Sequence, residues 1–181
     1  MRQPLISAYK DIAVVGLFFI LGWITVPDFP NNATTVPDRA AGRIIVYKSE
    51  RKMDLLDENS IPIKTYQISL GAHPAGHKTQ EGDEKTPEGV YKIISRNEKS
   101  RFHRSLRISY PNADDTAQAK ERNVSPGGDI MVHGLPNGLG WLGSLHRIFD
   151  TWTDGCIAVT DQEIEEIWNA VPDETPIEIR P

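Results

Sequence analysis

The sequence is short of cysteine and of positive charge. Cys156 is the single cysteine among 181 residues, which excludes a disulfide within the chain and a zinc site built from several thiolates. The 20 Lys and Arg residues are outnumbered by 25 Asp and Glu, for a net charge of −5. We therefore expect no nucleic-acid partner, because neutralising phosphates requires a surplus of basic side chains.

Motifs for cofactors are also missing. The chain has no glycine-rich nucleotide loop and no metal-binding motif, so we expect no cofactor and no metal. His73 and His77 are four residues apart, but Pro74 and Gly76 prevent the helix that would place both on one face. We expect a loop there.

Only one apolar run is long, which excludes a membrane protein with several spans. Ile12–Val26 contains fifteen residues, fewer than the roughly 20 that span a bilayer comfortably, and it follows two basic residues. We predict that residues 1–26 are a signal peptide or membrane anchor and residues 27–42 a linker rich in Pro, Asn and Thr. Residues 43–181 then form one extracytoplasmic domain, monomeric and in contact with the membrane only through the N-terminal segment.

After residue 42, short runs alternate apolar with polar residues, as half-buried strands do. Thr160 and Glu163 have the spacing of a capping box, and an apolar series at helical spacing runs from Ile164 until Pro172 ends it. Asp114–Arg122 is predicted to form a second, short, exposed helix. The domain is therefore expected to be mainly β with minor α. The predicted strands are Arg43–Lys48, Met53–Leu56, Lys64–Leu70, Val90–Ser95, Ser105–Tyr110, Asp129–His133 and Pro176–Ile179.

A histidine and the cysteine stand next to apolar segments. His133 ends an apolar strand, and Cys156 follows Thr153-Asp154-Gly155. A thiol nucleophile needs a partner that takes its proton, and imidazole is the usual one. Gly155 would allow a tight turn that points its own N–H and that of Cys156 at a developing oxyanion. The spacing alone does not separate such a site from a buried cysteine and a core histidine.

The chain contains, in this order, the motifs Gly82-Asp83-x-x-Thr86-Pro87-x-Gly89-x-Tyr91, His133-Gly134 and Thr153-x-Gly155-Cys156. These three motifs resemble the signature of the L,D-transpeptidase catalytic domain of the YkuD type. The resemblance covers residues 43–181 and implies a YkuD-like β-sandwich with a substrate groove and a short C-terminal helix. It also implies an enzyme of the bacterial cell envelope that needs no cofactor.

The resemblance implies a reaction on peptidoglycan stem peptides. The Cys156 thiolate attacks the carbonyl between the third and fourth stem residues, and an amine or a water resolves the thioester. His133 matches the base, Gly155 the glycine of the oxyanion hole, and Gly134 the source of the carbonyl that holds the histidine. Two positions depart from the common motif: Asp154 replaces a histidine, and Ala158 stands where many members carry an arginine that grips substrate.

These departures indicate a divergent branch and leave alternatives open. The acyl-enzyme is transferred to an amine, or it is hydrolysed by an L,D-carboxypeptidase or an amidase that detaches a wall-bound lipoprotein. A non-catalytic wall-binding module is the third alternative.

Four residues are candidates for binding substrate. Arg107 lies on the polar face of a predicted strand, and Arg147 lies between the two candidate catalytic positions. Trp152 and Thr153 precede the cysteine, where they would line the groove. His146, in the same stretch, is expected to be a surface or lid residue.

Overall fold

The computed structural model describes residues 40–149 and 151–181. The predicted export segment and most of the predicted linker lie outside these residues. Within them, no helix is long and apolar enough to cross a membrane. Packed structure begins before the first strand: Ala41 is 2% exposed and its N–H donates to the carbonyl of Ala170 at 2.6 Å.

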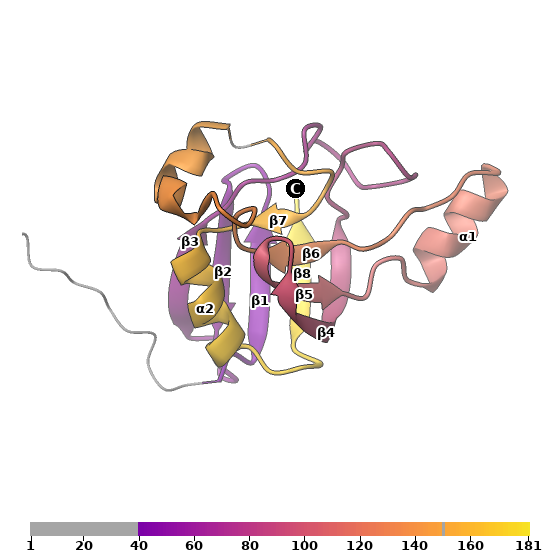
Figure 1. Ribbon diagram of the computed structural model, residues 1–181. Helices are drawn as coiled ribbons and strands as arrows, with labels where there is room; N and C mark the ends of the chain where they lie inside the picture. The colour runs from indigo at the N-terminus through magenta and orange to yellow at the C-terminus, as the bar shows by residue number, and fades with distance from the viewer. Residues whose placement is uncertain (1–39, 150) are drawn as a thin grey trace, which may run out of the picture. The chain divides into compact units, whose positions relative to one another are not determined.

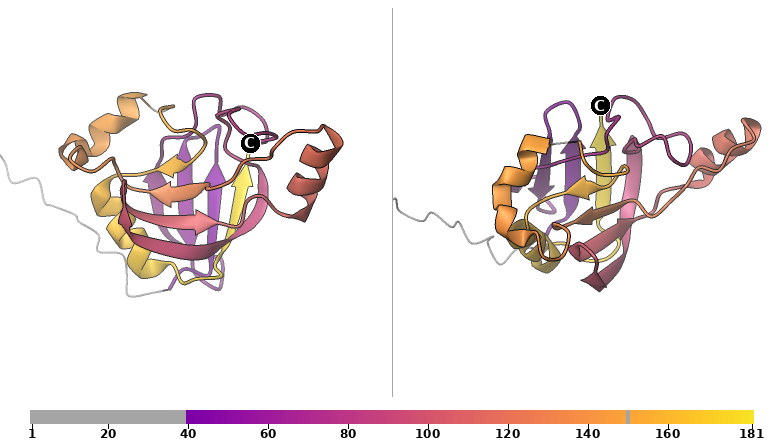
Figure 2. Two further views of the ribbon diagram at one scale, coloured as in Figure 1. Left: turned by 45° about the vertical axis from the view of Figure 1, so that its right-hand side comes forward. Right: turned by 45° about the horizontal axis from the view of Figure 1, so that its top comes forward.

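Eight strands form one continuous sheet in the order β3-β2-β1-β8-β4-β5-β6-β7. β4 belongs to two layers, because Gly89–Lys92 pair with β8 while the residues from Ile93 to Ser100 pair with β5 across two irregularities. The sheet folds over at this strand into a sandwich whose layers cross (Figures 1 and 2). The strands are β1 Arg43–Tyr47, β2 Lys52–Leu56, β3 Pro62–Gln67, β4 Gly89–Ser100, β5 His103–Ile108, β6 Met131–His133, β7 Ile157–Ala158 and β8 Pro176–Arg180.

Alternating residues of both layers fill the core. Ile44 and Val46 of β1 and Leu106 and Ile108 of β5 are fully buried, as the alternation in the sequence predicts. Helix α2 (Asp161–Ala170) adds Ile164 and Ile167 to the same cluster, and the predicted capping box at Thr160 is formed. The expected fold class, mainly β with minor α, is confirmed.

The segment after β3 pairs with β7, the edge strand of the sheet, and with the residues before Cys156. Ser69 pairs with Ala158 of β7, and Gly71 pairs with Thr153 just before the cysteine. Residues 64–70 were predicted as one strand, whereas β3 ends at Gln67. The chain then leaves β2 and bridges to β7, a pairing between residues that are distant in sequence.

Two helical segments lie outside the sandwich. Helix α1 (Ala113–Glu121), predicted from the sequence, begins at Asn112 and stands on an arm away from the sheets (Figure 1). The second, the 3₁₀ helix η1 (Gly140–Phe149), was not predicted. It has a kink at Gly143, where φ is 47°. It precedes the cysteine in the chain, and its His146 contacts Ser69, which pairs with Ala158 of β7.

Candidate active site

The strand register places the candidate catalytic residues on one face of the sheet. In the row across β5, β6 and β7, Ser105 pairs with His133 and His133 with Ala158. Their neighbours Leu106, Val132 and Ile157 point into the core, so this row points to the opposite face. Arg107 and Met131 pair in the next row, and Cys156, immediately before β7, continues it. His133 and Cys156 therefore occupy adjacent strands on the same face.

His133 is held as a neutral base. Its side chain is 2% exposed, and its Nδ1 lies 2.7 Å from the carbonyl oxygen of Gly134. Since a carbonyl only accepts, Nδ1 carries the hydrogen and Nε2 keeps its lone pair. Burial lowers the pKa of His133 to about 4. The ring packs against Phe102 and Trp152, with centroid distances of 4.4 and 5.8 Å.

Cys156 rests as a neutral thiol. Its Sγ donates to the carbonyl of Asp129 over 3.6 Å. Burial raises the pKa of the Cys156 thiol to about 11; a backbone hydrogen bond from Met131 opposes the rise, and the carboxylates of Asp154 and Asp129 add to it. Among residues 40–149 and 151–181, no hydrogen bond joins the thiol to His133. The register brings the two groups together, and the thiol must turn from Asp129 to reach the imidazole.

The turn before the cysteine depends on a glycine and a threonine. Gly155 has φ of 117°, and a Cβ there would lie 2.4 Å from the carbonyl oxygen of Lys85. No other residue fits without moving the neighbouring backbone. The Thr153 hydroxyl donates to the carbonyl of Cys156 at 2.7 Å and accepts from the N–H of Gly155 at 3.3 Å. The hydroxyl therefore both donates and accepts within the turn that presents Cys156.

The first sequence motif forms a loop that packs against this turn. The Asp83 carboxylate accepts from Lys78 at 2.8 Å and from three backbone N–H groups of the same loop. Burial alone would raise the pKa of Asp83, but these donors lower it to about 2. A Cβ on Gly71, at the start of the loop, would lie 2.1 Å from the carbonyl oxygen of Glu84. The motif therefore has a structural role: it fixes the wall beside Gly155.

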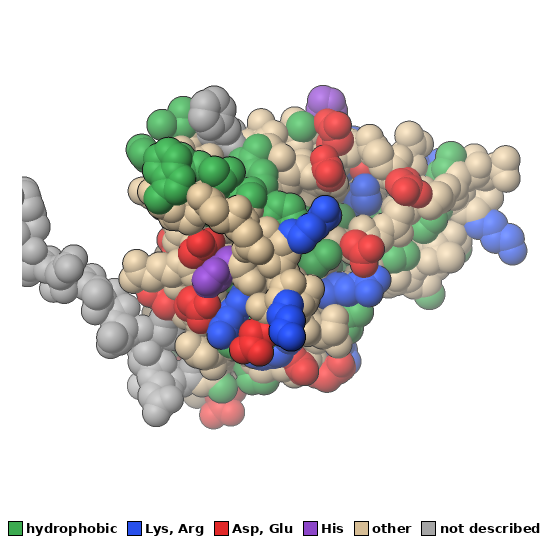
Figure 3. All heavy atoms as spheres, viewed as in Figure 1, with side chains coloured by type: hydrophobic (Ala, Val, Ile, Leu, Met, Phe, Trp, Pro, Cys, Tyr) green, Lys and Arg blue, Asp and Glu red, His purple; other side chains and the backbone are tan. Residues whose placement is uncertain are grey.

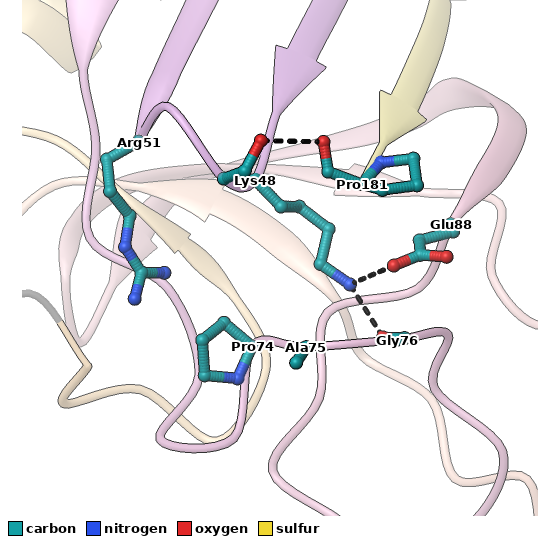
Figure 4. A pocket seen from close by; sticks show the side chains of 8 residues that line it. Lys48, Arg51, Pro74, Ala75, Gly76, Glu88 and Pro181 are labelled. Atoms are coloured by element: carbon teal, nitrogen blue, oxygen red, sulfur yellow. Dashed lines mark hydrogen bonds and ion pairs between the residues drawn. The ribbon is translucent and has the colours of Figure 1, made fainter.

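A pocket of about 300 Å³ lies on the other side of this loop (Figure 4). Its lining contains none of the candidate catalytic residues. Lys48, 3% exposed, donates there to the carbonyls of Gly76 and Thr86 and to the carboxylate of Glu88, at 2.7 to 2.8 Å. The lysine thus connects the loop to the end of β1. We assign this pocket a structural role, because neither His133 nor Cys156 lines it.

The two candidate arginines both have acidic partners. Arg107 is exposed and pairs with Asp129 at 3.0 Å, which brings it next to the residue whose carbonyl receives the thiol. Arg147 forms two bonds of 2.7 Å with the carboxylate of Glu163 in α2. This ion pair fastens η1 to α2.

Sequence reasoning missed three neighbours of the site. Phe102 and Asp129 carried no motif that would have singled them out. His146 was expected to be a surface or lid residue, and a surface position is wrong, because its side chain is 4% exposed. Its Nδ1 lies 3.1 Å from the Oγ of Ser69, a residue 77 positions earlier. The contact depends on the pairing of Ser69 with β7, which no sequence pattern indicates.

The outer face of η1 is apolar and exposed. Trp141, Leu145 and Ile148 are 76%, 56% and 72% exposed, and Figure 3 shows the patch over η1. Inward-facing His146 and outward-facing apolar residues therefore share one short helix that precedes Cys156 in the chain.

The structure is a β-sandwich that carries a neutral histidine and a cysteine on one face, and this arrangement is typical of cysteine enzymes. The chain belongs to the L,D-transpeptidase catalytic-domain (YkuD) family, whose family model matches residues 41–179. The protein named "Putative L,D-transpeptidase YafK" of Escherichia coli K12 is 32% identical over 133 residues, covering 71% of this chain. The chain spans about half the length of that relative, 46%.

Solved structures share the fold. The helical cell shape determining protein Pgp2 of Campylobacter jejuni is 22% identical, with a TM-score of 0.60 over 79% of this chain and 48% of its own. Bd1075 of Bdellovibrio bacteriovorus is 24% identical, with a TM-score of 0.56 over 78% of this chain and 48% of its own. The expected YkuD-like sandwich is confirmed by these similarities.

Proposed function

We propose that this domain is a peptidoglycan L,D-transpeptidase-like cysteine acyltransferase. The family match over residues 41–179 supports the reaction class. The observation that carries the proposal is the placement of His133 and Cys156 on one face of adjacent strands, with a free imidazole Nε2 lone pair. Gly155 and the turn of Thr153 present the sulfur.

In the proposed reaction, the thiol turns from the Asp129 carbonyl and transfers its proton to Nε2 of His133 as the sulfur attacks. The attacked carbonyl is that between the third and fourth stem residues. A tetrahedral intermediate forms, the imidazolium returns the proton to the leaving amine, and a thioester remains on Cys156. An incoming amine, deprotonated by His133, resolves the thioester and releases the free thiol. Of the four candidates for binding substrate, we assign substrate contacts to Arg107 and Trp152. Arg147, held by Glu163, and Thr153, whose hydroxyl is used within the turn, are assigned supporting roles.

The N–H of Cys156 is the donor that we assign to the oxyanion. The N–H of Gly155 already donates to the Thr153 hydroxyl at 3.3 Å, a long bond that the substrate oxygen would compete for. The glycine then contributes mainly the backbone conformation that aims the N–H of its neighbour.

Hydrolysis by an amidase is the second candidate function. The carboxylates of Asp154 and Asp129 lie within electrostatic reach of the sulfur, and Ala158 replaces the substrate-gripping arginine. Negative charge there disfavours a leaving group that carries a free carboxylate beside the scissile bond. A lipoprotein joined to the wall through the side-chain amide of a lysine has no carboxylate next to the scissile nitrogen.

We further propose that the protein acts in the bacterial envelope as a monomer, anchored or exported through its N-terminal segment.

Mass spectrometry of defined muropeptides incubated with the full chain tests both candidates. A cross-linked dimer supports transfer, and a shortened monomer or a released side-chain amine supports hydrolysis. Cys156→Ala serves as the control for product formed without the nucleophile. Failure of the folded wild-type protein to produce any of these products, with no adduct on Cys156, would contradict the proposed function and leave the binding-module alternative.

A further inference from the structure

A second histidine lies on the face that carries His133. Ser69 pairs with Ala158, which pairs with His133, so the three residues form one row across neighbouring strands. Their side chains point to the same face, and two strand spacings, about 10 Å, separate Ser69 from His133. His146 rests on Ser69 through the contact of 3.1 Å. It therefore stands above the same row, with the small side chain of Ala158 between the two histidines.

The serine fixes the tautomer of His146. Ser69 is fully buried, and His146 Nδ1 is the only partner of its hydroxyl among the described residues. A buried hydroxyl has to give its hydrogen to an acceptor, so it donates to Nδ1. The hydrogen of the neutral ring is then on Nε2. Burial lowers the pKa of His146 and Arg147 lowers it further, so the ring stays neutral at neutral pH.

Two buried N–H donors on this wall have no acceptor. His146 Nε2 and Trp152 Nε1 are both covered from solvent and unpartnered within the described residues. The two rings are 6.4 Å apart and perpendicular, and Trp152 also contacts His133. Leaving such donors unpaired is costly, and proteins rarely do so without a functional reason.

We propose that His146 and Trp152 form a substrate-binding site beside His133, in which both N–H groups donate to oxygen of the stem peptide. The inference rests on the proposed function. The ligand must be an acceptor, hence a main-chain carbonyl or a carboxylate and not an ammonium group. Both donors are covered in this structure, so the side chains that cover them must move as the substrate oxygen enters. Ser69 acts as a positioning residue, because it sets the tautomer.

Four variants of the full chain test the site. His146→Leu and Trp152→Phe each remove one donor, and the phenylalanine keeps a ring against His133. His146→Gln retains an N–H near the position of Nε2, and Ser69→Ala releases the tautomer. His73→Gln is the control, since its side chain is 67% exposed on a different loop. Kinetics with a stem tetrapeptide are compared with the affinity for the same peptide in a Cys156→Ala background.

We expect His146→Leu and Trp152→Phe each to lower kcat/KM at least about 3-fold, mainly through KM, with matching losses of affinity. His146→Gln should recover at least half of the loss, and His73→Gln should equal the wild type. Ser69→Ala should weaken binding less than His146→Leu. If Trp152→Phe and folded His146→Leu both bind and react within twofold of the wild type, the two residues have a structural role only and the proposal is overturned.

A tetrapeptide with a terminal carboxamide distinguishes the two oxygens. If the donors hold the terminal carboxylate, the variants should cost about 10- to 100-fold with the acid and much less with the amide. Equal losses with both peptides assign the bonds to a main-chain carbonyl. The affinity measurement separates this proposal from the previous one. A wild-type protein that binds the peptide through these donors without turnover refutes the proposed reaction and retains the site.

Discussion

At the scale of single residues, burial decides the protonation of the two groups that would do the chemistry. Burial lowers the pKa of His133 to about 4 and raises the pKa of Cys156 to about 11. At neutral pH both groups are uncharged, so the resting pair is thiol and imidazole and not a preformed ion pair. The thiolate arises only as the proton moves to His133 during attack.

The activity should therefore vary little with pH around neutrality. His133 is a free base above pH about 4, and the thiol remains protonated below about 11. We expect kcat/KM to be flat between roughly pH 6 and 9, because neither group of the free protein titrates there. Alkylation of Cys156 by iodoacetamide, followed by mass spectrometry, should be slow at pH 7 and rise steadily above pH 9. A limb of the kcat/KM profile centred near pH 6.5 would contradict the buried neutral histidine.

Replacing either group should affect chemistry far more than folding. Cys156→Ala removes the nucleophile and should abolish turnover with the melting temperature nearly unchanged. His133→Ala should lower kcat by about 10² to 10⁴, the scale of losing a general base. His73→Ala, on an exposed side chain, is the matched histidine control. Muropeptide turnover and thermal melts measure both effects, and near-wild-type turnover of Cys156→Ala would refute the assignment.

At the scale of elements, α2 anchors η1, the 3₁₀ helix that precedes Cys156 in the chain. The Thr160 hydroxyl accepts from the N–H of Glu163, and the Glu163 carboxylate also receives both bonds from Arg147. Thr160→Ala should lower the free energy of unfolding by about 1 kcal/mol, the usual cost of losing an N-cap.

Urea unfolding measures this difference. Thr116→Ala is the matched control, because its hydroxyl lies on exposed α1 and caps no helix end. It should stay within about 0.5 kcal/mol of the wild type. Equal effects of the two substitutions would show that the cap does not hold α2.

The same elements show how far the sequence predicts the structure. Alternation and capping locate most strands and both α-helices, because these patterns depend on neighbours in the chain. β4 runs to Ser100, beyond its predicted end at Ser95, since its second half pairs with β5 where few side chains are buried. β7 has only two residues, too few for any pattern. Its register nevertheless brings Cys156 to His133.

The sequence also predicts only part of the candidate site. Cys156, His133 and the turn glycine can be selected from residue chemistry and motif order. The burial of His146 cannot, because it depends on Ser69 crossing to β7 from a segment 77 residues away.

At the scale of the whole molecule, the chain joins an N-terminal apolar run to one catalytic-type domain. We predict that Ile12–Val26 directs export. A reporter enzyme that is active only outside the cytoplasm, fused after residue 42, should be active in bacteria. Deletion of residues 1–26 should abolish the signal, and a reporter active without them would contradict the prediction. Immunodetection of the fusion shows whether the segment is cleaved.

β8 is the last described strand in chain order, yet it lies in the middle of the sheet. Pro176–Arg180 lie between β1 and β4, parallel to one and antiparallel to the other. A chain that lacks these five residues exposes two bare strand edges and divides the core. The sheet therefore cannot be completed until Arg180 has been synthesised, and a truncation before Pro176 should yield an aggregation-prone product instead of a shortened domain.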